Sequence, residues 1–178
     1  MDSCILDADV IIQFATLNEL AVVTWIAERV YVHAVVVQEI LPVTKEGKAL
    51  RVLLGNGLIQ VSDDDLDPAE KMLLETYRYE LRPYMSTRPG LEHYGEFATV
   101  AFAAVRAIPL VASNETAVKS ILHSQWTKSG VRVVDCGEVV IMAYRNGCFG
   151  KRKYAKSLYK RVSGRSTEAF DRELLLPG

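Results

Sequence analysis

The hydrophobic positions along this chain of 178 residues follow two alternating patterns. Compact apolar runs, typical of buried strands, alternate with longer segments in which apolar residues recur at helical spacing. The runs that predict strands are residues 3–7, 30–34, 58–62, 108–112 and 131–135, of which 58–62 is a candidate edge strand. Strands that alternate with helices predict an α/β fold, in which a central and mostly parallel sheet is flanked by helices in three layers.

Helical spacing predicts the segments that connect these strands. Helices are expected at 11–20 with a break near 18, at 35–41 as a short helix or turn, then up to about 54, and at 68–81, 96–107, 114–126 and 136–147. Pro42 limits the second helix, because a proline disfavours helical geometry at the preceding residue. Asp67 and Pro68 form a typical helix start, and residues 82–90 are expected to form a loop.

The charge distribution divides the chain into an acidic body and a basic tail. The whole chain has a net charge of −1, but residues 151–178 carry eight Lys or Arg and three Asp or Glu, which leaves −6 on residues 1–150. We therefore expect one α/β domain at 1–150 and a basic helical tail at 151–178 that packs on the domain or on a partner. The tail fits either a nucleic-acid contact or a solvated amphipathic helix.

The sequence also predicts a cytoplasmic protein without a membrane segment. No apolar run approaches the roughly 18 residues needed to cross a bilayer, and the amino terminus carries Asp2 and no basic residue before its apolar segment, unlike a signal peptide. The three cysteines, Cys4, Cys136 and Cys148, are far apart and lack metal-binding spacing. Such cysteines are typical of reduced thiols in the cytoplasm.

Carboxylates and one amide stand where the predicted strands end. Asp7 ends the first strand, Glu39 follows the second, Asn114 and Glu115 follow 108–112, and Glu96 begins the preceding helix. Functional crevices of parallel sheets lie outside the carboxyl ends of the strands. Crowded carboxylates repel one another unless a cation neutralises them, and Mg²⁺ or Mn²⁺ prefers oxygen ligands. The pattern predicts a divalent-metal site that could activate water and stabilise charge on a phosphodiester.

Each of these residues also has an ordinary structural explanation. Asp7 or Asp9 could cap the following helix, and Glu96 could stabilise a helix amino terminus through the helix dipole. Glu39 could be an exposed helical glutamate, and Asn114 with Glu115 could be a cap and a first-turn acid. These explanations stay open at the level of the sequence.

The opening stretch, LDADV, resembles two families. It matches the first motif of haloacid-dehalogenase-like phosphatases, in which the first Asp (here Asp7) is the nucleophile and the second (Asp9) an acid/base. That resemblance covers only about ten residues, because VRVVDCGE offers at most one late acid and no lysine is convincingly placed between.

More of the chain, residues 3 to about 135, resembles PIN-domain nucleases, including the ribonuclease toxins of bacterial toxin–antitoxin modules. The matching motifs are the strand ending in Asp7 and Asp9, the run VVVQEIL with Glu39, the Ala-rich helix GEFATVAFAA with Glu96, and the turn PLVASNE. The resemblance implies a PIN-like fold and a divalent-metal-dependent endoribonuclease acting on single-stranded RNA, with Mg²⁺ or Mn²⁺ as cofactor.

The resemblance also implies roles for individual residues. Catalysis and metal binding would fall to Asp7, Glu39, Glu96 and Asn114, with Glu115 as a further metal ligand and Asp9 and Ser113 as auxiliaries. The fourth position usually holds Asp in that family, and Asn supplies a carbonyl oxygen but no charge. The alternative is a degenerate PIN-like domain that binds RNA or protein without cutting.

Basic segments are the candidates for RNA contacts. KRKYAKSLYKR, 151–161, combines phosphate-neutralising side chains with tyrosines that could stack on bases, and its first members are Lys151, Arg152, Lys153 and Tyr154. The same spacing suits an amphipathic helix that packs on the domain. Arg82 and Arg88 precede Glu96 and could contact a phosphate backbone or lie on an ordinary loop. A protein antitoxin and a homodimer are further partners that the family resemblance implies.

Overall fold

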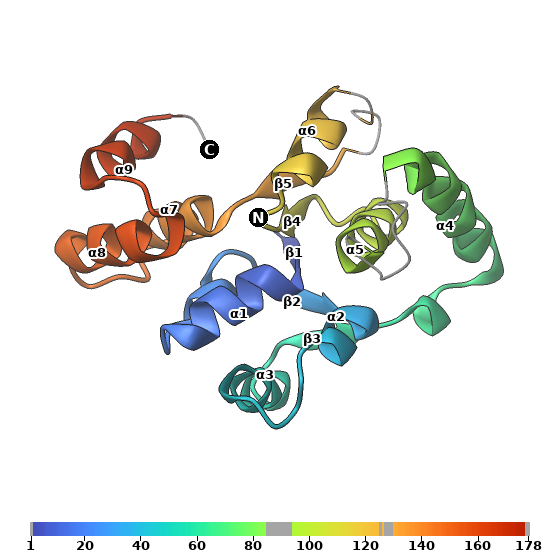
Figure 1. Ribbon diagram of the computed structural model, residues 1–178, viewed down its shortest axis with the longest axis horizontal. Helices are drawn as coiled ribbons and strands as arrows, with labels where there is room; N and C mark the ends of the chain where they lie inside the picture. The colour runs from blue at the N-terminus through green and yellow to red at the C-terminus, as the bar shows by residue number, and fades with distance from the viewer. Residues whose placement is uncertain (1, 85–93, 125, 127–129, 177–178) are drawn as a thin grey trace.

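A computed structural model describes residues 2–84, 94–124, 126 and 130–176. Within these ranges the chain forms a five-stranded sheet in which all strand pairs are parallel, with the order β3-β2-β1-β4-β5 (Figure 1). The strands are β1 (Ser3–Leu6), β2 (Arg29–His33), β3 (Ile59–Val61), β4 (Leu110–Ala112) and β5 (Arg132–Val134). Four lie inside the segments predicted as strands, β2 begins one residue before its predicted segment 30–34, and β3 is at an edge as expected. The predicted α/β class is confirmed.

The strand order reverses at one place in the sheet, between β1 and β4. From β1 the chain moves outward through β2 to β3, and it then returns to place β4 on the other side of β1 and β5 beyond it. Ile5 of β1 is in register with Tyr31 of β2 on one side and Val111 of β4 on the other. The connections that leave β1 and β4 therefore diverge at the carboxyl ends of these two strands, which is where open α/β sheets bind ligands.

Helices cover both faces of the sheet (Figure 1). They are α1 (Ala8–Thr16), α2 (Ala34–Glu39), α3 (Lys45–Gly55), α4 (Pro68–Leu81), α5 (Tyr94–Val105), α6 (Thr116–Ser124), α7 (Cys136–Arg145), α8 (Arg152–Ser163) and α9 (Thr167–Leu174), with 3₁₀ turns η1 (Leu20–Trp25), η2 (Asp63–Asp65) and η3 (Arg82–Tyr84). The expected break near residue 18 is present, because Asn18 has a φ of 58° that ends α1. The rest of the predicted loop 82–90 lies outside the described residues.

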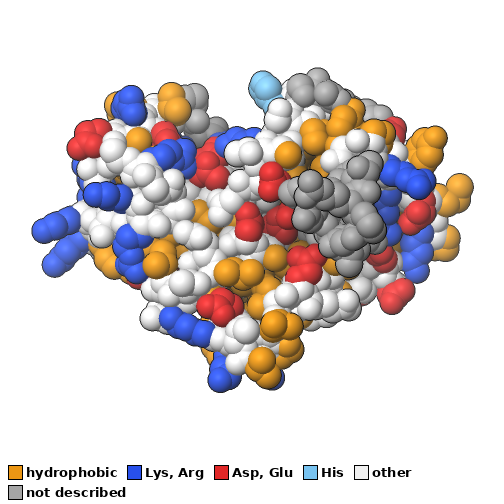
Figure 2. Space-filling model, in the orientation of Figure 1, with side chains coloured by type: hydrophobic (Ala, Val, Ile, Leu, Met, Phe, Trp, Pro, Cys, Tyr) orange, Lys and Arg blue, Asp and Glu red, His pale blue; other side chains and the backbone are white. Residues whose placement is uncertain are grey.

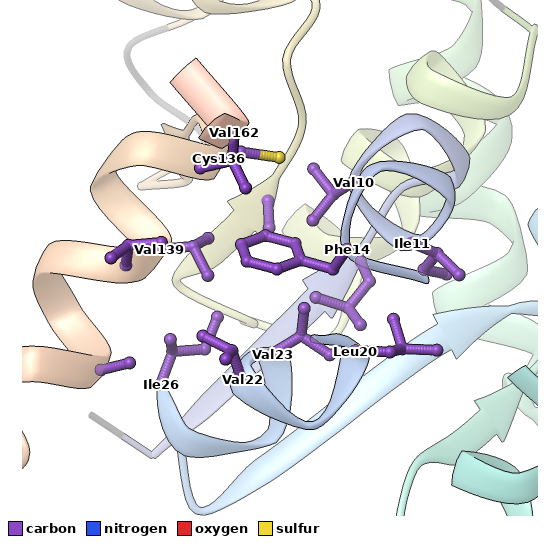
Figure 3. Close-up of a cluster of buried hydrophobic side chains, with 14 of the residues drawn as sticks. Val10, Ile11, Phe14, Leu20, Val22, Val23, Ile26, Cys136, Val139 and Val162 are labelled. Atoms are coloured by element: carbon purple, nitrogen blue, oxygen red, sulfur yellow. The ribbon is translucent and has the colours of Figure 1, made fainter. Parts of the chain in front are cut away.

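Two hydrophobic cores sandwich the sheet, which gives the three predicted layers. Cys4 and Leu6 of β1 face the core that contains α1, α3, α7, α8 and α9, whereas Ile5 faces the core that contains α4, α5 and α6. Figure 3 shows the first core, where Phe14 of α1 lies between Val23 of η1 and Val139 of α7. Burial on both faces explains why the central strands β1 and β4 appear in the sequence as continuous apolar runs.

The basic tail belongs to the first core. Leu158 and Tyr159 of α8 and Phe170 of α9 are fully buried, and the rings of Tyr159 and Phe170 meet edge to face at 5.5 Å. A Cβ at Gly137 of α7 would overlap the guanidinium of Arg165, so this glycine permits the close packing of the tail on α7. Among the described residues, no helix is long and apolar enough to cross a membrane.

Candidate active site

Asp7 lies at the carboxyl end of β1, where the strand order reverses. Its backbone N–H donates to Ala112 O of β4 at 3.0 Å, and its side chain is 1% exposed. Oδ1 accepts a bond from the backbone N–H of Ala8 at 2.8 Å, and Oδ2 accepts one from the hydroxyl of Ser113 at 2.8 Å. Asp7 is therefore the helix cap of α1 and also a buried acid held from both β1 and β4.

Asp9 joins the same two segments one step further out. Its Oδ2 accepts the backbone N–H of Asn114 at 2.7 Å, and its Oδ1 accepts the N–H of Val10 at 2.6 Å. The first turn of α1 is thus tied to the loop that follows β4. Both carboxylate oxygens of Asp9 accept hydrogen bonds from backbone N–H groups. Asp9 therefore stabilises the loop after β4 and also places a second carboxyl group beside Asp7.

Glu39 and Glu96 approach the site from the other side. Glu39 ends α2 and Glu96 lies in the first turn of α5, and these two helices are in contact. A Cβ at Gly95 would overlap the carboxylate of Glu39, so this carboxylate lies directly against the start of α5. The charge of Glu96 contributes to the raised pKa values of Asp7, Asp9 and Glu39. Glu96 is therefore the residue whose charge acts on the three other carboxyl groups of the cluster.

The pKa values show how unfavourable these charges are together. Burial raises the pKa of Asp7 from its ordinary value near 3.8 to about 8, and the charges of Asp9 and Glu96 add to this, while the bonds from Ser113 and Ala8 oppose it. Burial is also the largest cause of the raised pKa values of Asp9 and Glu39. At neutral pH Asp7 therefore keeps its proton unless a positive charge replaces it.

Asn114 turns its side chain toward α7. The backbone N–H of Cys136 donates to Asn114 Oδ1 at 3.0 Å, and Asn114 Nδ2 donates to the sulfur of Cys136 at 3.2 Å. The amide of Asn114 thus joins the loop after β4 to the start of α7 and is not directed at Asp7. Neither Cys136 nor Gly95 was predicted as a site residue, since a close contact between distant segments leaves no periodic or spacing signal.

Ser113 and Glu115 complete the loop. The buried hydroxyl of Ser113 donates to Asp7 and accepts the backbone N–H of Glu115 at 3.1 Å. Glu115 Oε1 accepts the N–H of Ala117 at 3.2 Å, which is a helix-start bond, and its charge still raises the pKa of Asp9. Ser113 is therefore the side chain that most directly orients Asp7.

The chemistry of the cluster suits a hard divalent cation, although its side chains do not enclose one. Carboxylate oxygens are the ligands that Mg²⁺ and Mn²⁺ prefer. Within the described ranges no group of three or more His, Cys, Asp or Glu is arranged to hold a metal ion. Figure 2 shows acidic side chains gathered near the centre of the face where α1, α2, α5 and α6 converge in Figure 1. A cation would have to draw these carboxylates together.

The predicted RNA-contact residues lie elsewhere. The hydroxyl of Tyr154 donates to Glu19, just beyond the carboxyl end of α1, whereas Asp7 is at the opposite end of this nine-residue helix, about 13 Å away at 1.5 Å per residue. Arg152 pairs with Asp171 of α9 at 2.6 Å, and Lys151 and Lys153 are exposed at the start of α8. Arg82 is exposed in η3. Arg88 lies outside the described residues.

No protein-family model matches the chain, and no curated protein matches its sequence. The similarity to PIN-domain nucleases therefore stays a prediction that depends on the four motifs. What the fold establishes is a parallel α/β sheet with a buried acid, Asp7, at the carboxyl end of β1, beside the half-buried Asp9 and Glu96 and the exposed Glu39.

Proposed function

We propose that the protein is a divalent-metal-dependent endoribonuclease that cleaves single-stranded RNA at the cluster formed by Asp7, Asp9, Glu39 and Glu96. The observation that carries this proposal is Asp7, an acid that is 1% exposed and has a pKa of about 8. It lies at the carboxyl end of β1, where the strand order reverses. A buried acid whose pKa is raised by other acids is costly for folding, and such groups gather at functional sites.

The chain's own residues would hold and orient the reacting groups. Asp7, Glu39 and Glu96 would be the carboxylates that hold Mg²⁺ or Mn²⁺, which when bound lowers the pKa of water and stabilises charge on a phosphodiester. Ser113 fixes the orientation of the Asp7 carboxylate, and Asp9 holds the loop after β4. Asn114 serves as a positioning residue through Cys136. Asp7 must release its proton before it can bind a cation.

Cleavage of a mixed single-stranded RNA pool tests the proposal. Wild-type protein is expected to cut the pool with Mn²⁺ and not with EDTA, and Asp7→Asn is expected to abolish cutting. Asp64→Asn, an exposed acid in η2, is the matched control and should cut normally. Equal inactivity of the wild type and Asp7→Asn, with RNA binding intact in both, would refute the nuclease.

A domain that binds RNA without cutting is the second candidate. The observation that favours it is the absence, among the described residues, of a three-ligand metal group, together with the engagement of the Asn114 amide by Cys136. The same assay separates the two candidates, because a non-cutting domain binds the RNA pool and leaves it intact with Mn²⁺.

The phosphatase interpretation has less support. A nucleophilic Asp7 would have to be ionised and reach the phosphorus of a substrate, but its carboxyl is buried and both oxygens accept hydrogen bonds. This interpretation predicts turnover of small phosphate esters and a covalent aspartyl-phosphate on Asp7. Mass spectrometry of protein quenched during incubation with acetyl phosphate measures the second.

We further propose that the protein acts in the cytoplasm, where its free cysteines stay reduced. A protein antitoxin and a homodimer remain proposals that depend on the family resemblance. Co-purification with a small partner and light scattering of the purified chain test these two partners.

A further inference from the structure

A groove with basic walls runs along the β5 edge of the sheet, between α6 on one side and α7 and α9 on the other. Two cavities of about 320 and 490 Å³ meet there, and both are lined by Lys119, Arg132 and Glu138. Figure 2 shows the corresponding notch in the outline of the molecule, with Lys and Arg side chains inside it. We call this feature the basic groove.

Cations outnumber carboxylates in the basic groove. Its described charged lining is Lys119, Arg132, Arg145, Arg165, Glu138 and Glu173, and Asp135 beside it pairs with Arg165 at 2.6 Å and with Lys119 at 3.9 Å, which makes four cations to three carboxylates. Glu138 is shared by Lys119 at 2.6 Å and Arg132 at 3.5 Å, and Glu173 pairs with Arg165 at 3.0 Å. The side chains of Lys119 and Arg132 are each 47% exposed, so an anion in solution can reach both.

The helices that form the basic groove begin next to the loop that borders the acidic cluster. The backbone N–H of Lys119 donates to the carbonyl of Glu115, which places Lys119 one helical turn beyond the loop that holds Asp7 and Asp9. On the opposite wall Asp135 accepts a bond from Arg165 at 2.6 Å, and the next residue, Cys136, is bonded to Asn114 of the same loop. The loop after β4 is therefore bonded to both α6 and α7, the helices that form the two walls of the groove.

We propose that the basic groove holds the sugar–phosphate backbone of the RNA strand on one side of the acidic cluster, an inference that rests on the proposed nuclease function. Lys and Arg neutralise phosphates. The described lining includes no Phe, Tyr or Trp on which a base could stack, so the contacts we propose are those of Lys119 and Arg132 with phosphates.

The position of the groove next to the cluster favours RNA over an acidic protein segment. An RNA strand in the groove leads a phosphodiester to carboxylates that a cation has neutralised, whereas an acidic peptide on the same path meets Glu115 and Asp9 as like charges. The tail helix α8 is a weaker candidate, because Tyr154 in its first turn reaches Glu19, beyond the end of α1 that lies opposite Asp7.

Fluorescence anisotropy with a labelled single-stranded 12-nucleotide RNA tests the proposal, using the full chain in EDTA so that binding is measured without cutting. Lys119→Gln/Arg132→Gln is expected to weaken binding about tenfold. It is also expected to reduce the slope of log K against log salt by about 1.4, because each lost phosphate contact on a single strand contributes about 0.7.

Three further variants make the result decisive. Lys119→Arg/Arg132→Lys keeps both charges and should bind within about threefold of the wild type, which excludes a folding defect as the cause. Lys48→Gln/Lys71→Gln removes two exposed lysines from α3 and α4 and should bind normally. Lys153→Gln/Lys160→Gln on α8 should lose less affinity than the groove variant. A larger loss from the α8 variant, or equal affinity of the groove variant and the wild type, overturns the proposal.

A labelled glutamate 12-mer measures the acidic-peptide possibility. Binding of this peptide as tight as that of the RNA, with the same loss in Lys119→Gln/Arg132→Gln, would assign the basic groove to a protein and overturn the proposal. Failure of the nuclease itself is seen separately: RNA binding that depends on the groove, without cutting in Mn²⁺, rejects the proposed function and retains the groove as an RNA-binding surface.

Discussion

The hydroxyl of Ser113 donates a 2.8 Å hydrogen bond to the buried carboxyl of Asp7 and so links the residues that follow two neighbouring strands. Asp7 follows β1 and Ser113 follows β4, and 106 positions separate them in the chain. The bond lowers the pKa of Asp7, but burial and the charges of Asp9 and Glu96 outweigh it. The site thus holds one acid in position while making its ionised form unfavourable.

Asp7→Asn is expected to stabilise the protein at high pH. The unfolded chain releases the Asp7 proton near pH 3.8 and the folded chain near pH 8, so the folded state holds more protons between these values and stability falls as pH rises through this window. Asn keeps the shape without the ionisation. Urea unfolding at pH 8 should show a gain of about 1–3 kcal/mol over the wild type, shrinking toward pH 4. Asp64→Asn should show no such pH-dependent gain.

Binding of Mn²⁺ should strengthen as pH rises toward 8. Below the Asp7 pKa of about 8 a cation must displace the proton from the carboxyl, so the apparent affinity should fall by up to about tenfold for each pH unit below that value. A thermal-shift experiment measures this pH dependence of the affinity. It compares the rise in melting temperature caused by one fixed Mn²⁺ concentration at pH 6, 7 and 8. A pH-independent rise, or the same rise in Asp7→Asn, would contradict the assignment of Asp7 as a ligand.

Gly95→Ala is expected to impair the site more than the fold. The added Cβ would overlap the carboxylate of Glu39, a flexible side chain that can move away, so we expect a stability loss of only about 1 kcal/mol. Cleavage should fall at least about tenfold because Glu39 is displaced. Gly55→Ala is the matched control, since a Cβ there meets no atom within 4 Å. Equal cleavage by the two variants would remove Glu39 from the active site.

Substitutions of Asn114 separate its structural role from its charge. Asn114→Ala loses both bonds to Cys136 and should reduce the free energy of unfolding by about 1–2 kcal/mol. Asn114→Asp keeps the acceptor for the Cys136 N–H at the start of α7, where a negative charge is favourable, and should lose less. It should also bind Mn²⁺ more tightly than the wild type in a thermal-shift titration. Unchanged Mn²⁺ binding by Asn114→Asp would show that the position lies outside the metal site.

The central strands β1 and β4 were predictable because each is buried on both faces and so forms a continuous apolar run. The convergence of Asp7 and Ser113 was predictable for a related reason, since each directly follows a strand of one parallel sheet. The partners of Asn114 and Glu39 were not, because Cys136 and Gly95 meet them through packing between segments that no local pattern connects. The sequence likewise gives no sign that Asp171 and Glu19 bind residues of the basic tail.

The packing of the tail has a consequence for the order in which the protein is made. The acidic residues of the candidate active site all precede position 116. However, α1, which begins beside Asp7, is bonded to the tail, because the side chain of Gln13 donates to the carbonyl of Val162. Phe14 on the same helix shares its core with Phe170. A ribosome therefore completes every acidic residue of the site well before it releases the helices that support them. We expect the nascent chain to stay without a finished site until α8 and α9 have been synthesised and can pack on α1 and α7.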